Sequence, residues 1–173
     1  MSRSTGTARI ACGALLLFFI LIVPIRSVLA FAHDPECPRW RSAFLGMPTR
    51  TLVIQASGGQ RIPIPVKLAA TDEARWAGFQ CATREEIRAT VILFDFGTEL
   101  LGTFHMRNVR SPLDIAFAKG SGRIFAILNM KPSPTKVYGP MGAFRYAIEA
   151  RAGFFDETGI LVGYSLSLEG AEQ

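Results

Sequence analysis

Few side chains in this sequence have the chemistry expected of an active site. His105 is one of two histidines, and it lies between Phe104 and Met106 in a strand-like segment. Neighbouring side chains of a strand point to opposite faces, so burial of Phe104 and Met106 places His105 outside or in a pocket. There it could act as a general base or contact a ligand. The alternative is a histidine on the surface or hydrogen-bonded within the fold.

A second group of polar residues lies around a predicted turn. Asn108 begins the segment NVRSP, Asp114 follows it, and Arg75 lies farther upstream. Asn and Asp at such places commonly hydrogen-bond the backbone and fix the turn, and a buried Asp–Arg pair would also serve structure. Alternatively, a polar cluster of Arg75, Asn108 and Asp114 binds a small anion or polar ligand. The candidate ligand-binding residues are therefore Arg75, His105, Asn108 and Asp114, and no catalytic residue is assigned.

Two of the three cysteines, Cys37 and Cys81, follow the apolar N-terminal run that contains Cys12. In an exported protein such a pair is expected to form a disulfide, here closing a loop of 44 residues (81 − 37). Two alternatives stay open. Both thiols could be free, or Cys81 could be a reactive thiol partnered by His105.

Other familiar chemical motifs do not occur in the sequence. It has no H-E-x-x-H, C-x-x-C or EF-hand spacing, and no Walker loop, dinucleotide fingerprint or G-x-S-x-G. We therefore expect neither a metal nor a cofactor. The adjacent acids at residues 72–73 and 85–86 lie where helices are predicted to start, and there they favour the helix dipole.

The charge distribution argues against a nucleic-acid partner. The chain has 19 basic and 14 acidic residues, but Arg3, Arg9 and Arg26 precede the first acid. From residue 33 onward, 16 basic residues (19 − 3) stand against 14 acidic ones. A nearly neutral domain lacks the positive surface that a phosphate backbone requires.

The N-terminal segment has the pattern of an export signal. Residues 10–25 are 16 uncharged, mostly apolar residues, preceded by arginines and followed by the A-x-A pattern of Ala30 to Ala32. We expect a signal peptide over residues 1–32, cleaved after Ala32 or else after Ala30. The alternative is an uncleaved membrane anchor, although the run is shorter than the roughly 20 residues that cross a bilayer. The expected location is periplasmic or secreted, or anchored in the inner membrane facing the periplasm. Membrane contact is expected only if the segment is uncleaved.

The rest of the chain predicts one β-rich domain at 48–170, preceded by a Pro- and Arg-rich lead-in at 33–47. Thr71 and Thr83 are expected helix N-caps, and Gly78 is expected to end the first of these helices. The predicted fold is mainly β (α+β): a small antiparallel barrel-like or sandwich domain with two or three short helices. Strands are expected at 51–56, 61–69, 90–96, 100–106, 113–120, 123–130, 144–150 and 160–169, and helices at 71–79, after 83 and at 151–159.

One stretch resembles a known family. FHMRNVRSPLDIAFAKGSGRI (104–124) resembles the pattern F-x-M-x-N-x-x-x-P-L-D-I-x-F of the DUF192 family, also called UPF0127. KLAATDEARWAGF (67–79) resembles its strand-then-helix opening, with Arg75 and Gly78 at family positions, and 144–163 resembles its closing elements. The sequence departs from the family where His105 replaces a usual Trp, and where Gln80-Cys81-Ala82 replaces Met-Phe-Arg.

The resemblance implies a compact, mainly β, often exported domain and implies no reaction. We expect an uncharacterised, non-enzymatic module of the cell envelope that binds an unknown small ligand or an envelope protein. The alternative is an enzyme of unknown reaction that uses His105 with Asp114 or Cys81, and the sequence leaves that choice open.

Overall fold

The computed structural model describes residues 34–169, and the predicted signal peptide or anchor lies outside the described residues. Within this range the fold is mainly β (α+β), as predicted, with nine strands and four short helices. None of these helices combines the length and apolar character needed to cross a membrane. The elements are α1 (Cys37–Gly46), β1 (Thr49–Gln55), β2 (Arg61–Ala69), α2 (Asp72–Ala77), α3 (Arg84–Ala89), β3 (Ile92–Leu100), β4 (Phe104–His105), β5 (Leu113–Ala118), β6 (Ile124–Met130), β7 (Val137–Tyr138), β8 (Phe144–Arg151), α4 (Phe154–Thr158) and β9 (Ser165–Leu168).

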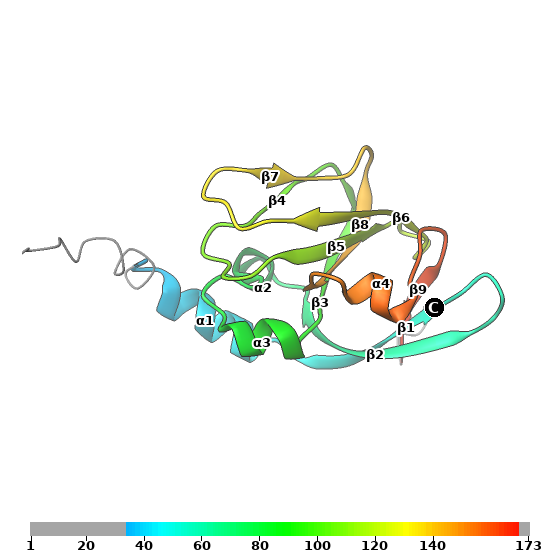
Figure 1. Ribbon diagram of the computed structural model, residues 1–173, viewed down its shortest axis with the longest axis horizontal. Coiled ribbons are helices and arrows are strands. Elements are labelled where there is room, and N and C mark those ends of the chain that lie inside the picture. The colour runs from blue at the N-terminus through cyan, green and yellow to red at the C-terminus, as the bar shows by residue number, and fades with distance from the viewer. Residues whose placement is uncertain (1–33, 170–173) are drawn as a thin grey trace, which may run out of the picture. The chain divides into compact units, whose positions relative to one another are not determined.

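Seven strands form one sheet in the order β6-β5-β8-β3-β2-β1-β9, and β4 and β7 form a separate pair (Figure 1). The expectation of a wholly antiparallel sheet is wrong at one place, because β2 and β3 are parallel. Parallel neighbours need a crossover connection, and α2 and α3 supply it. The described strands do not form a closed barrel, which corrects that part of the expectation.

The two edges of the large sheet nevertheless meet at one point. A single bridge pairs Arg123 with Ser165, and the amide of Leu166 donates to the carbonyl of Gly122. A Cβ at position 122 would lie 2.3 Å from the carbonyl oxygen of Leu166. Only glycine permits this approach, and its φ of +83° also favours glycine.

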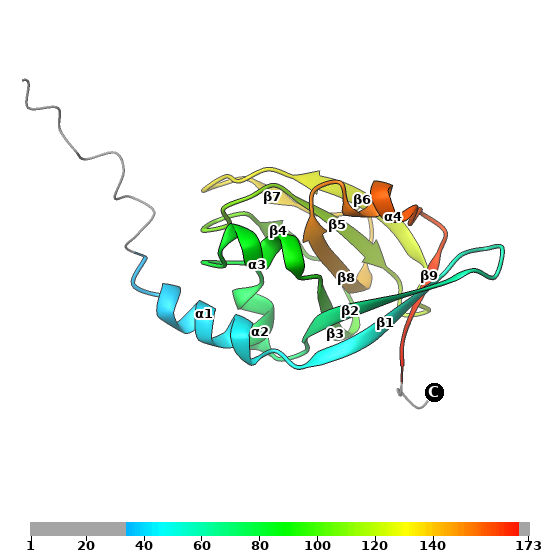
Figure 2. The same cartoon turned by 60° about the horizontal axis from the view of Figure 1, so that its bottom comes forward.

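The β1–β2 hairpin is as predicted, with Gly59 at positive φ in its turn. Pro63 and Pro65 lie in the half of β2 that pairs with β1 alone, because β3 pairs only with the segment Lys67 to Ala69. These prolines therefore occupy an edge, where a missing N–H leaves no ladder bond unmade. In Figures 1 and 2, α1, α2 and α3 gather at the end of the domain opposite the hairpin tip.

The lead-in contains a helix, which corrects the expectation of an irregular segment. Pro38 lies in the first turn of α1, where a helix loses no hydrogen bond to proline. Trp40 and Phe44 are four residues apart and are both buried. A disulfide joins Cys37 to Cys81 with a Cα–Cα distance of 5.6 Å, so the predicted pairing is confirmed.

Two other segments differ from expectation. The predicted strand at 100–106 is divided, because β3 continues through Leu100 after an irregularity and only Phe104 and His105 form β4. The segment 131–142, where no strand or helix is expected, contains β7, whose pairing with β4 the sequence did not indicate.

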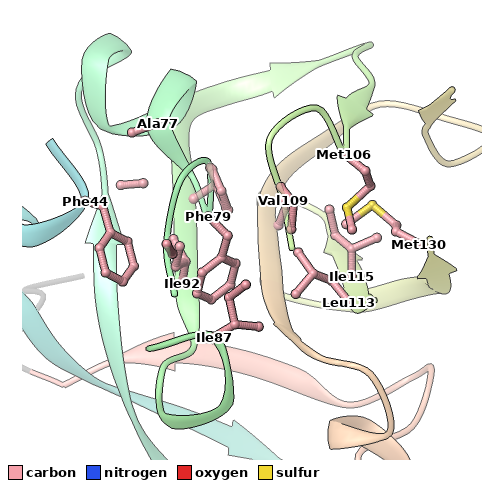
Figure 3. Close-up of a cluster of buried hydrophobic side chains, with 14 of the residues drawn as sticks. Phe44, Ala77, Phe79, Ile87, Ile92, Met106, Val109, Leu113, Ile115 and Met130 are labelled. Carbon is pink, nitrogen blue, oxygen red and sulfur yellow. The ribbon is translucent and has the colours of Figure 1, made fainter. Parts of the chain in front are cut away.

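The central strands are buried on both faces. One hydrophobic cluster lies between the sheet and the first three helices and extends to Met130 on β6 (Figure 3). A second cluster, which includes Phe155 of α4 and Leu166 of β9, covers the other face. Ile115 and Phe117 face the first cluster, while Ala116 and Ala118 face the second. This arrangement explains why the segment Ile115 to Ala118 of β5 is apolar on both faces.

Candidate functional site

A pocket of about 390 Å³ opens between α2, the segment around β4 and the face of the sheet that packs on the first hydrophobic cluster. The capped helix α2 brings Trp76 and Gly78 to it, and β3 brings Phe94 and Phe96. Six aromatic side chains line the pocket, Trp76, Phe79, Phe94, Phe96, Phe104 and Phe144, and polar groups come from Asp72, Arg75, Gln80, Thr103, His105 and Glu149.

The aromatic wall is held by contacts between its own rings. Phe104 meets Phe94 edge-on at a centroid distance of 5.1 Å, and Phe144 meets Phe96 edge-on at 5.4 Å. Phe144 also packs edge-on at 4.9 Å against Phe117 beneath the wall. Edge-to-face contacts of this kind fix ring orientation, so the pocket is formed before any ligand arrives.

Glu149 places a carboxyl among these rings. It lies on β8 directly opposite Ile92 of β3 and Ile115 of β5, and its exposed fraction is 4%. Burial alone raises the pKa of this carboxyl to about 8, because no described residue provides a hydrogen bond or counter-charge. A Cβ built on Gly78 would lie 3.6 Å from Oε2 of Glu149, which places the carboxyl beside the glycine that ends α2.

His105 is the second ionisable group with an unusual environment. Pairing of β4 with β7 sets His105 opposite Val137, and its ring lies 6.4 Å from that of Trp76. Its Nδ1 is buried and has no hydrogen-bond partner among the described residues. Burial, and then the charge of Arg107, lower its pKa, so the imidazole is neutral at pH 7. A neutral ring with an unpaired nitrogen can still bond a ligand.

Comparison with known proteins identifies the family. The model of DUF192, described as an uncharacterized ACR, matches residues 53–168, which is more than half of the chain. The chain belongs to the DUF192 family. No curated protein matches it significantly.

Two crystal structures resemble this DUF192 domain. One, from Sinorhizobium meliloti and provisionally described as a transcription regulator, is 25% identical with a TM-score of 0.65, covering 72% of this chain and 96% of that one. The other, of unknown function from Novosphingobium aromaticivorans, is 24% identical with a TM-score of 0.63, covering 70% of this chain and 86% of that one. The second likeness concerns the fold alone.

The pocket brings together two of the four candidate residues, Arg75 and His105. The guanidinium of Arg75 is already engaged. Its Nη1 donates to the carbonyls of Ala70 (2.7 Å) and Asp95 (2.8 Å), and its Nη2 donates to Asp72 at 2.6 Å. Arg75 therefore ties the start of α2 to β3 at the edge of the pocket.

Asn108 and Asp114 are not among the pocket-lining residues. Asn108 has a φ of +59°, and its side-chain amide donates to Asp34. The carboxylate of Asp114 accepts from the side chain of Asn129 at 2.9 Å and from the amide of Gly153 at 2.7 Å. These bonds connect β5 to β6 and to the start of α4, so the two residues have different surroundings from His105.

The sequence reasoning missed Glu149. By alternation along β8, this residue shares a face with Arg145, Ala147 and Arg151, which suggests a polar, solvated face. The face is instead covered at its centre, because β8 is a central strand with α2, α3 and β4 packed over it. An acid in the middle of the apolar stretch Ala147 to Ala150 is the signal that could have revealed it.

Gly78 should tolerate no side chain without a loss of stability. Its φ of +46° and ψ of −131° lie in a region that L-residues rarely adopt. We expect Gly78→Ala to lower the free energy of unfolding by about 1–3 kcal/mol, measured by urea denaturation. Gly58→Ala is the control, since its Cβ would meet open space and its φ is ordinary, and we expect a change below about 1 kcal/mol. Equal effects of the two substitutions would contradict this assignment.

Proposed function

We propose that this DUF192 domain is a non-enzymatic binding module that takes a small organic ligand in the aromatic pocket. The observation that carries the proposal is a preformed pocket, lined by six aromatic side chains, that contains a buried carboxyl without a partner among the described residues. The volume, about 390 Å³, lies within the range of small-molecule sites. Few convergent polar groups on apolar walls are typical of sites that select a ligand by shape and one or two hydrogen bonds.

The surroundings of His105 favour binding over catalysis. The enzymatic alternative needs a thiol at Cys81 or a carboxylate at Asp114 beside this histidine. Cys81 is bonded to Cys37, and both oxygens of Asp114 accept hydrogen bonds from other groups. Neither residue lines the pocket.

We further propose that the domain works outside the cytoplasm, in the periplasm or secreted. The disulfide between Cys37 and Cys81 supports this location, because such bonds persist in oxidising compartments. The predicted signal peptide agrees with it. An envelope protein remains the alternative partner if no small molecule binds.

A fragment screen by ligand-observed NMR tests the binding function. We expect hits whose affinity falls about tenfold in Trp76→Ala, because a large aromatic contact is a common source of binding energy. The Trp76 side chain is 60% exposed, so its removal should leave the fold intact.

Leu161→Ala is the matched control. Leu161 is also an exposed apolar residue, at 56%, but it does not line the pocket. Its truncation should leave the affinities unchanged. Absence of any hit, or hits that bind equally to wild type and Trp76→Ala, would contradict the proposed site.

A further inference from the structure

Among the ionisable groups of the pocket, one acid, Glu149, has no basic partner. Asp72 and Arg75, both on α2, form an ion pair with each other. His105 on β4 is neutral at pH 7 because burial lowers its pKa. From α3, which also packs over β8, the buried residue is Ile87, and the residues opposite Glu149 on the flanking strands are Ile92 and Ile115. No described residue therefore supplies a positive charge to Glu149.

Resting on the proposed function, we infer that the ligand is a small organic cation, an alkylated ammonium whose charge pairs with Glu149 and whose alkyl groups contact the aromatic wall. The chemical class of the ligand follows from charge complementarity with the pocket. A buried carboxylate is costly without a partner charge, and a cation in the pocket would provide one. An anion would meet Asp72 and Glu149, with the only lining guanidinium already bonded to Asp72 and two carbonyls.

The wall suits a cation with an apolar body. Faces of Trp, Tyr and Phe attract ammonium groups within about 6 Å of the ring centre, and cages of such rings bind methylated ammonium ions. The molecule already contains this kind of contact at the pocket edge, where the guanidinium carbon of Arg75 lies 5.4 Å from the ring centre of Phe96. The rings of Phe94, Phe104 and Trp76 also line the pocket.

Cation binding must be coupled to a proton. In the free domain the carboxyl of Glu149 is protonated at neutral pH, since burial raises its pKa to about 8. When the cation binds, the O–H bond of this carboxyl breaks, the proton passes to the buffer, and the carboxylate pairs with the ammonium. Affinity should therefore increase with pH up to the pKa of Glu149 and then level off. A neutral ligand that accepts a hydrogen bond from the protonated carboxyl would show the opposite dependence.

Choline and its uncharged isostere 3,3-dimethylbutan-1-ol are the probes, titrated calorimetrically into the domain at pH 6.5 and pH 8.5. We expect choline to bind more tightly than the alcohol at pH 8.5, and to lose roughly twentyfold in affinity at pH 6.5. Titrations in buffers with different heats of ionisation should count about one proton released per choline at pH 6.5.

Glu149→Gln separates charge recognition from shape. The substituted side chain has nearly the same size and carries no charge. We expect choline affinity to fall at least tenfold and to become independent of pH, while the affinity for the alcohol changes less than twofold. A uniform loss for both probes would indicate a structural role and would overturn the inference.

The results distinguish this inference from the proposed function. If neutral fragments bind at the pocket but the alcohol binds as well as choline, or choline affinity does not rise with pH, the inference is wrong and the binding function stands. The same holds if neither probe binds while other, uncharged fragments do. If no molecule binds at the pocket, both proposals fail.

Discussion

Between pH 5 and pH 8 the domain should lose about 3–4 kcal/mol of stability through Glu149 alone. The pKa of this carboxyl is raised by burial from 4.5 to about 8 in the folded state. A raised folded-state pKa means that the folded protein holds a proton which the unfolded chain releases. The contribution of Glu149 is therefore fully present below pH 4.5 and declines until about pH 8. Urea denaturation at one-unit pH intervals measures the decline.

Glu149→Gln should remove most of this pH dependence and should be more stable than wild type at pH 8. His105, whose pKa is lowered by burial, has the opposite sign: its contribution to stability increases as pH rises toward 6.5 and is fully present above that pH. Because His105 is present in both proteins, the difference between their curves of stability against pH gives the contribution of Glu149. Parallel curves for wild type and Glu149→Gln would show that the carboxyl is not buried as described.

The loss of folding stability at acid pH has a different origin. Arg41 hydrogen-bonds Glu86 and lowers the pKa of that carboxyl from 4.5 to about 2. A lowered folded-state pKa gives stability that is present above pH 4.5 and lost as pH falls toward 2. This loss lies outside the window from pH 5 to pH 8, so the two carboxyls can be measured separately.

Loss of the disulfide should have an effect of similar size. Cys37→Ala is expected to lower the free energy of unfolding by about 4 kcal/mol, because the bond closes a 44-residue loop and restricts the unfolded chain. Cys37 is the preferred position, since Cys81 has a φ of +59° and its replacement would add a backbone effect.

Reduction of the wild type is the control for that substitution. Equilibrium denaturation with and without a phosphine reductant should give a difference equal to the effect of Cys37→Ala. The reduced wild type should also match the reduced variant within about 1 kcal/mol. A difference near zero between oxidised and reduced wild type would contradict the expected contribution.

Local sequence signals predicted the local structure well. Thr71 caps α2, Gly78 ends it, and Thr83 and Glu86 form a capping box for α3. These features depend on hydrogen bonds between residues three or four apart, and such local bonds can be predicted from residue types at that spacing. The disulfide was predictable for another reason, because only two cysteines remain after the N-terminal segment.

Features that depend on distant packing were not predictable in the same way. The parallel pairing of β2 with β3 depends on how α2 and α3 return the chain, and no residue pattern encodes that direction. The burial of Glu149 depends on coverage of β8 by elements more than forty residues upstream. The sequence identified His105 and Arg75 as candidates by their chemistry, but it contained no measure of which polar residue would be enclosed.

The contact of Gly122 with Leu166 has a consequence for the order of folding. β9 pairs with β1 on one side and meets the residues at the start of β6 on the other, so one short strand covers the edge of β1 and the beginning of the edge of β6. Unprotected edges recruit strands from other molecules. A chain still emerging from a ribosome lacks β9 until residues 165–168 appear. Until these residues appear, the backbone groups that β9 later pairs with are open, and strands of other molecules can compete for them.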